Sequence, residues 1–278
     1  MRRVVALVCS AALLSGLGAC TGELPQVVPM PDGVTLLSDQ SRLHRKDREI
    51  YIRIQNKSDK PIHIEAFTLM SERITDVKWT GDEEVPAGTE ADLEYDMPSA
   101  KCGTGFTPTV RLTYRMGNGK RVESDARADD RYGSISHAMD RDCAESTLNE
   151  AAKLEVGDPS IVGDGRESVF HLPVTMTPTG KRADVRFGGF GSTVLFNQAE
   201  GSPADVDVPL TGSPIKIEML VTPARCDGHA LADDKVGRLF DVKVLGDDVG
   251  KNASFYLPLN TPQRVKFFDF YRSHCGLD

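Results

Sequence analysis

The placement of cysteines in two similar segments is the feature that most constrains what this chain can fold into. The sequence has 6 cysteines, and four of them lie after residue 100, at Cys102, Cys143, Cys226 and Cys275. An even number of cysteines in a chain that begins with a secretory signal, described below, indicates disulfides, and four cysteines allow three pairings. Metal ligation is the competing interpretation, but it is weak because no two of these cysteines have CxxC-like spacing.

The sequence around the first of these cysteines recurs in the second half of the chain. Ala100-Lys101-Cys102-Gly103 matches Ala224-Arg225-Cys226-Asp227, and an alternating strand pattern follows in each half. Each of these strands leads into a turn of Gly, Asn or Asp that ends in a lysine, Lys120 or Lys251. The match is weak at each residue but keeps its order along the chain, which is typical of duplicated domains.

This repeat selects one of the three pairings, Cys102–Cys143 and Cys226–Cys275. Each disulfide would close a loop of about 40–50 residues and contribute about 3–4 kcal/mol by the chain-entropy argument. A short segment of mixed periodicity precedes each second cysteine, over Tyr132–Asp142 and Val265–His274. The latter holds the densest aromatic stretch of the chain, and we expect core packing there because such residues are usually buried.

Within each half the dominant pattern has a period of two residues, which predicts β-strands. Ile50, Ile52 and Ile54 alternate with polar residues, and after a turn the pattern resumes with Ile62, Ile64 and Ala66. Further strands are predicted over Ile74–Thr80, Thr89–Asp96, Lys153–Val156, Ser168–Met176, Ala183–Phe187, Thr193–Asn197, Ala204–Leu210, Ile215–Val221, Leu239–Leu245 and Ser254–Leu259. Pro and Gly interrupt the strands about every ten residues, a spacing typical of antiparallel sandwiches. The arrangement is similar to tandem immunoglobulin-like domains and predicts an all-β fold of two such sandwiches, without the Cys–Trp–Cys pattern of antibody domains.

The first twenty residues have the order of a secretory signal. Arg2 and Arg3 precede an apolar run, Val4–Leu14, which is followed by small residues. The run is too short for the ~20 residues that span a bilayer. Leu17-Gly18-Ala19-Cys20 resembles the lipobox of bacterial lipoproteins, which implies cleavage before Cys20 and a lipid on its sulfur. The alternative is an ordinary signal peptide with a chance cysteine.

These signals predict four regions along the chain. Residues 1–19 are expected to be the signal peptide and residues 20–40, rich in Pro, a lipidated tether. Residues 41–148 would form the first sandwich and residues 149–278 the second, with a polar boundary near Ala144–Ala152. In composition the chain resembles lipoproteins of high-GC Gram-positive bacteria such as actinobacteria, which indicates its origin. The signal and the lipobox-like Cys20 imply a lipid-anchored location on the outer face of the cytoplasmic membrane.

Charge limits the partners of this chain. Without residues 1–19, which hold two arginines and no acids, 31 basic and 41 acidic side chains leave a net charge of −10. An acidic surface repels phosphate backbones, so nucleic acid is not an expected partner. A basic segment, Leu43–Arg48, precedes the first strand of the first sandwich.

The sequence shows few signs of catalysis. It contains no HExxH, GxSxG or phosphate-loop motif, and no cofactor or catalytic residue is predicted. The candidate ligand or metal site is the segment after Cys226, where Asp227, His229 and Asp233 could hold a cation through oxygen and imidazole ligands. Ordinary turn chemistry at Asp227-Gly228 is the alternative. We therefore expect a non-catalytic binding or scaffold module, membrane-bound through Cys20, with an envelope protein as partner. A divergent hydrolase or a metal-binding protein is the alternative.

Overall fold

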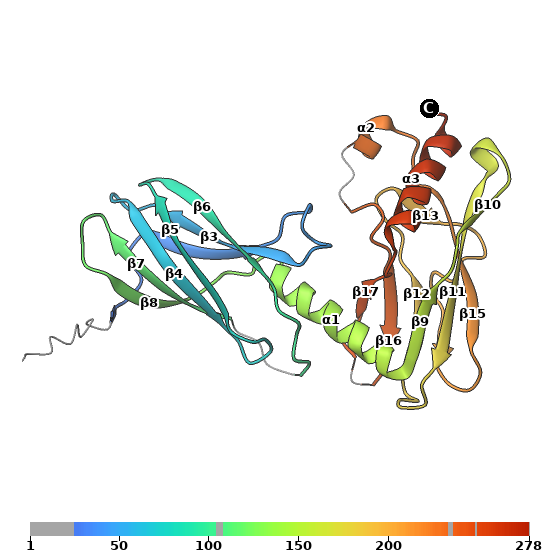
Figure 1. The fold of residues 1–278 in the computed structure, drawn as a ribbon, viewed down its shortest axis with the longest axis horizontal. Helices are drawn as coiled ribbons and strands as arrows, with labels where there is room; N and C mark the ends of the chain where they lie inside the picture. The colour runs from blue at the N-terminus through green and yellow to red at the C-terminus, as the bar shows by residue number, and fades with distance from the viewer. Residues whose placement is uncertain (1–24, 104–107, 233–235, 248, 278) are drawn as a thin grey trace, which may run out of the picture.

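The computed structural model of the protein describes residues 25–103, 108–232, 236–247 and 249–277. It contains two β-sandwiches that follow one another along the chain, and the helix α1 (Ser134–Ala151) runs from the first sandwich to the second (Figure 1). Strands far outnumber helices, so the predicted all-β fold is confirmed.

The first sandwich has a larger sheet with the order β1-β8-β7-β4-β5 and a smaller sheet with the order β2-β3-β6. Neighbouring strands are antiparallel except β1 and β8, which are parallel. This is an immunoglobulin-like division, because β2, β3 and β6 occupy the places of strands A, B and E, and β8, β7, β4 and β5 those of G, F, C and C′. The strands are β1 (Gln26–Val27), β2 (Val34–Asp39), β3 (Glu49–Asn56), β4 (Ile62–Met70), β5 (Val77–Val85), β6 (Thr89–Asp96), β7 (Thr109–Met116) and β8 (Val122–Arg127).

Alternation along β3 and β4 builds the first core, with one interruption. Ile50, Ile52 and Ile54 of β3 are fully buried, as their spacing predicts. In β4 the pairing register shifts between Ile64 and Ala66, a β-bulge that moves the following residues to the other face. Phe67 therefore lies in the core. The period-two pattern had predicted a buried Ala66 instead, and Ala66 is only partly buried.

The second sandwich pairs its strands in a similar way. One sheet has the order β10-β11-β15-β13, with β9 also paired to β11, and the other has the order β14-β12-β16-β17. Its elements are β9 (Ala152–Val156), β10 (Ser160–Val162), η1 (Gly165–Glu167), β11 (Val169–Pro178), β12 (Arg186–Phe190), β13 (Phe196–Gln198), β14 (Val208–Pro209), β15 (Ile215–Pro223), α2 (Gly228–Ala232), β16 (Asp241–Leu245), β17 (Ser254–Tyr256) and α3 (Thr261–Cys275).

Each sandwich ends in a helix that a disulfide ties back to the loop after an earlier strand. Cys102 follows β6 and is bonded to Cys143 in α1, whereas Cys226 follows β15 and is bonded to Cys275 in α3. Both predicted pairings are confirmed. The segments of mixed periodicity before the second cysteines fall largely within the two helices. No helix among the described ranges is both long and apolar enough to cross a membrane.

The C-terminal helix α3 supplies aromatic side chains to the second core. Phe267, Phe270 and Tyr271 are buried among the phenylalanines of the sheets, which confirms the expected core packing, while Val265 is exposed. The helix begins with a capping box, in which the Asn260 side chain accepts from the Gln263 amide and the Gln263 side chain accepts from the Asn260 amide, each at 2.9 Å.

Helix α1 contributes to both hydrophobic cores. Its first half places Ile135, Ala138 and Met139 in the core of the first sandwich. Its second half places Ala144, Leu148 and Ala151 in the core of the second. At 100° per residue these two apolar stripes lie about 180° apart around the helix axis. The two sandwiches therefore pack on opposite sides of one continuous helix.

Two features differ from the sequence prediction. The polar boundary expected near Ala144–Ala152 lies in the last turns of α1 and at the start of β9, where the helix passes directly into the strand. The tether expected over 20–40 includes β1 and β2, so the first sandwich begins at Gln26 and not at residue 41. Val34 and Leu36 are buried there, because β2 pairs with β3 along its whole length.

Removal of a buried side chain from α1 tests its place in the second core. Leu148 is fully buried, and we expect Leu148→Ala to lower the free energy of unfolding by about 2–5 kcal/mol, because it leaves a cavity. The neighbouring Asn149 is exposed, so Asn149→Ala should change the free energy of unfolding by no more than about 0.5 kcal/mol. Urea unfolding followed by circular dichroism measures both, and equal midpoints for the two variants would contradict this packing.

Candidate functional site at the junction of the two sandwiches

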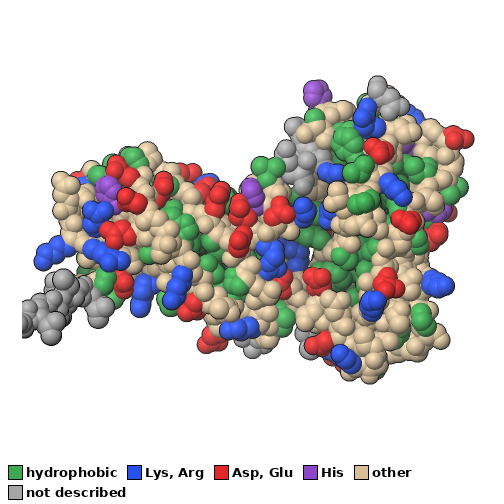
Figure 2. Space-filling model, viewed as in Figure 1, with side chains coloured by type: hydrophobic (Ala, Val, Ile, Leu, Met, Phe, Trp, Pro, Cys, Tyr) green, Lys and Arg blue, Asp and Glu red, His purple; other side chains and the backbone are tan. Residues whose placement is uncertain are grey.

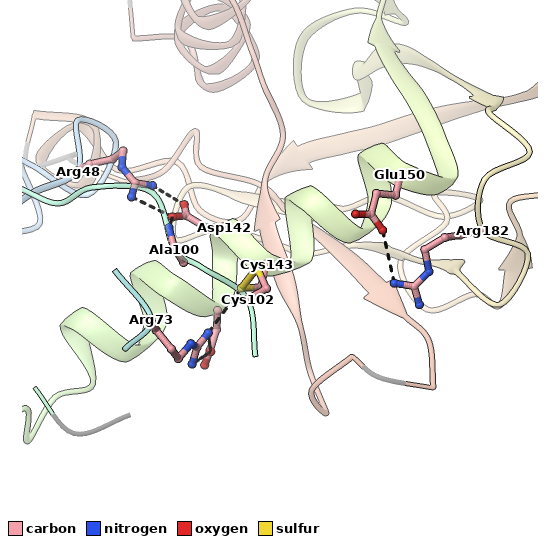
Figure 3. Close-up of a disulfide and its surroundings, with 9 residues drawn as sticks. Arg48, Arg73, Ala100, Cys102, Asp142, Cys143, Glu150 and Arg182 are labelled. Atoms are coloured by element: carbon pink, nitrogen blue, oxygen red, sulfur yellow. Dashed lines mark hydrogen bonds and ion pairs between the residues drawn. A yellow bond between two sulfur atoms is a disulfide. The ribbon is translucent and has the colours of Figure 1, made fainter. Parts of the chain in front are cut away.

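An ion pair with several hydrogen bonds fixes α1 to the first sandwich. The Arg48 guanidinium contacts both carboxylate oxygens of Asp142 (Figure 3). It also donates to the carbonyl oxygens of Met97 and Pro98 at 3.0 and 2.8 Å. The Asp142 carboxylate also accepts from the backbone amide of Ala100 at 2.8 Å. The loop after β6 is thus held against the helix by a bidentate, charge-assisted network.

The first disulfide lies one residue further along α1. Cys143 is joined there to Cys102, and the Arg73 guanidinium approaches the Cys143 sulfur at 3.5 Å and the Asp140 carboxylate at 3.4 Å. A covalent bond and an ion-pair network therefore hold the middle of the helix to the first sandwich.

The end of α1 is fixed to the second sandwich in a different way. The Thr179 backbone amide donates to the Ala151 carbonyl at 2.8 Å, and the Thr179 hydroxyl donates to the carbonyl oxygens of Glu150 and Ala151. The Arg182 guanidinium lies 3.7 Å from the Glu150 carboxylate (Figure 3). These contacts satisfy carbonyl groups that a helix end otherwise leaves without partners.

Three cavities surround the helix in the described part of the chain, with volumes of about 450, 220 and 860 Å³, and Arg141 of α1 lines all of them. The second lies where the basic segment after β2 meets Phe255, Leu257 and Arg264 of the second sandwich. Figure 2 shows Lys and Arg side chains at the waist between the two bodies. Carboxylates line the second and third cavities as well, Asp142 and Glu145 in one and Asp140 and Asp241 in the other, so arginines outnumber acids most clearly in the first. The first and third cavities have volumes that suit small ligands.

The first of these cavities, which we call the junction pocket, is formed by the first sandwich and the start of α1. It is lined by Asp39, Gln40, Arg42, Arg45, Tyr132, Ser134, His137 and Arg141. The Asp39 carboxylate is already engaged, because it accepts from the Ser134 hydroxyl at 2.8 Å, the Gln40 amide at 2.7 Å and the Tyr51 hydroxyl at 3.2 Å.

The 860 Å³ cavity holds a carboxyl group with a shifted pKa. Burial raises the pKa of Asp241, while a hydrogen bond from Ser254 at 3.2 Å and the charges of Arg141 and Lys243 oppose this rise. The Arg141 guanidinium also lies 4.8 Å from the centre of the Tyr256 ring, a cation–π contact between α1 and β17.

The segment singled out from the sequence, Asp227 and His229, lies elsewhere, at α2. The Asp227 carboxylate accepts from the backbone amide of His229 at 2.9 Å, so this contact uses the main chain and not the imidazole. Asp233 lies outside the described residues, as does Cys20. Within the described ranges no group of three or more His, Cys, Asp or Glu residues is placed to hold a metal ion. The capping turn matches the alternative interpretation from turn chemistry.

Sequence reasoning missed the junction pocket. It did identify the basic segment Leu43–Arg48, but the side chains that complete the pocket, Tyr132, His137 and Arg141, come from a later part of the chain. Only the helical geometry of α1 and its docking to the first sandwich bring them beside this segment.

Neither a family model nor a curated protein matches this sequence. Among solved structures, the chain is similar to a transglutaminase of red sea bream, with 10% identity, coverage of 83% of this chain and 32% of that chain, and a TM-score of 0.26. It is also similar to an exo-chitosanase of Amycolatopsis orientalis, with 16% identity, coverage of 81% and 26%, and a TM-score of 0.21. The chain spans no more than a third of the length of these two proteins. Such low TM-scores support no assignment of activity or partner.

Loss of the Asp142 charge tests the attachment of α1 to the first sandwich. We expect Asp142→Asn to lower the free energy of unfolding by about 1.5–3 kcal/mol, because it breaks charge-assisted bonds to Arg48. The matched control is Asp125→Asn, which breaks an exposed bidentate pair with Arg111 and should cost at most about 1 kcal/mol. Urea unfolding measures both, and equal losses would contradict a special role for Asp142.

Asp241 makes stability depend on pH in a predictable direction. Because its folded pKa is raised, the folded chain keeps this proton to higher pH than the unfolded chain, and stability falls as pH rises from the ordinary Asp value through the raised one. Asn cannot lose a proton, so Asp241→Asn should gain stability relative to the parent protein as pH rises through this window. Urea unfolding at acid and neutral pH measures the difference in the free energy of unfolding between the variant and the parent protein. A difference that is the same at both pH values would contradict the prediction.

Proposed function

We propose that this chain is a non-catalytic binding or scaffold module, anchored by lipid on Cys20 to the outer face of the cytoplasmic membrane, with an envelope protein as partner. The lipobox-like sequence Leu17-Gly18-Ala19-Cys20 supports the anchor. The two disulfides support an oxidising compartment outside the cytoplasm, where such bonds form and persist.

The observation that carries the binding role is the insertion of α1 into both cores. A pair of sandwiches on a flexible linker would present two independent surfaces, whereas a shared helix holds the loops of both in one fixed arrangement. Binding residues are commonly found on loops that a rigid scaffold positions, and pre-organisation reduces the entropy lost on association. The junction around α1 is therefore the surface that we assign to recognition.

The anchor is tested by a change at the lipidation site. Cys20→Ala should release or mislocalise the protein, because the lipid is attached to the sulfur of this cysteine. Fractionation of intact cells measures this, and unchanged membrane association of the variant would refute the anchor.

The partner is tested by a photo-crosslinking residue placed at two positions of the anchored protein. Leu43 is 56% exposed and lies in the loop before β3, next in sequence to Arg42 of the junction pocket, whereas Lys57 is exposed and directly follows the other end of β3. Irradiation of intact cells should give a discrete envelope-protein adduct from position 43 and not from position 57. Identical adducts from both positions, or none from position 43, would overturn recognition at the junction.

A further inference from the structure

Arginines in the first sandwich and α1 fall into two groups by charge pairing. Those in the larger group each lie within 4 Å of a carboxylate: Arg48, Arg53, Arg73, Arg111, Arg115, Arg121 and Arg131. In the described ranges, Arg42, Arg45, Arg127 and Arg141 form no such pair. Three of these four line the junction pocket. Guanidinium groups without a carboxylate within 4 Å are thus concentrated at one concave site of about 450 Å³, where Arg42 and Arg45 are joined by Arg141, which also lies over the Tyr256 ring.

The charge of the junction pocket has the opposite sign to that of the whole chain. Arg42, Arg45 and Arg141 carry three positive charges against the single carboxylate of Asp39, a formal net of +2 for these four residues, whereas the chain carries a formal −8. Asp39 already accepts three hydrogen bonds from its own neighbours. No arginine of the pocket lies within ion-pair distance of its carboxylate, so an anion from outside would meet guanidinium donors that are not already bonded to Asp39.

Two further side chains give the junction pocket shape and polarity. Tyr132 is 66% exposed, so its ring and hydroxyl are available to a ligand. The His137 ring packs against Gly133, where a side-chain Cβ would lie only 3.0 Å from a ring atom, so the glycine makes room for the imidazole.

We propose that the junction pocket binds a doubly charged oxyanion group, as found in a phosphate monoester or a dicarboxylate. Two negative charges balance the net charge of the lining residues, and the planar guanidinium fork matches the oxygens of either group. This inference goes beyond the proposed envelope partner, because it concerns a ligand within the cavity and stands whether or not a protein binds around it.

Calorimetric titration of the full mature protein tests this inference. The probes are inorganic phosphate and succinate, with acetate as the monoanion and a short Asp/Glu peptide as the model of an acidic protein segment. We expect saturable binding of phosphate or succinate that is tighter than that of acetate. The probe with the tighter binding shows whether the pocket prefers a phosphate group or a dicarboxylate.

Variants of equal charge change locate the binding. Arg42→Gln with Arg45→Gln changes exposed side chains of the junction pocket and should weaken dianion binding roughly 10- to 100-fold, through loss of charge-assisted hydrogen bonds. Arg115→Gln with Arg121→Gln removes the same charge from the pair that contacts Glu65, away from the pocket, and should leave binding unchanged. Equal weakening in both variants, binding of the peptide alone, or no saturable binding of phosphate or succinate would overturn the proposal. None of these results depends on the crosslinking outcome.

Discussion

Helix α1 is the constraint on which the rest of this structure depends. Its two apolar stripes face opposite directions, and each enters a different hydrophobic core, so neither sandwich is complete without it. The Arg48–Asp142 network and the Cys102–Cys143 disulfide attach its first half to the first sandwich, while Thr179 caps its last carbonyl groups from the second. The sandwiches are consequently joined by packed helix and not by a linker, and Arg141 of this helix lines three cavities, two of which also include residues of the second sandwich.

Much of the fold could be predicted from the sequence, because period-two patterns and the repeated cysteine segments reflect local geometry. Alternation located the fully buried isoleucines of β3, and the repeat identified both disulfides. Helix α1 was missed for a physical reason: apolar residues on opposite sides of a helix cancel, so the segment has no single amphipathic face. Helix α3 did carry a signal, since Asn260 to Gln263 forms a capping box with Pro262 in the first turn.

The candidate site could be predicted only in part. The basic segment Leu43–Arg48 is visible in the sequence, but its partners in the junction pocket become neighbours only through tertiary packing of α1. The β-bulge after Ile64 was equally hidden, because alternation alone gives no sign of an inserted residue. At Asp227 and His229, the residue types suggested a ligand site, whereas the structure shows the main-chain contact of a short capped helix.

The fixed arrangement of the two sandwiches is tested most directly by a distance measurement between them. Spin labels introduced as non-natural residues at Lys57 and Glu200, both exposed and one in each sandwich, avoid the disulfide cysteines. Pulsed electron paramagnetic resonance then reports the distribution of distances between the labels. A single narrow distribution is the result that a helix shared by both cores predicts. A broad distribution, or several separate distances, would show that the sandwiches move independently and would contradict this account.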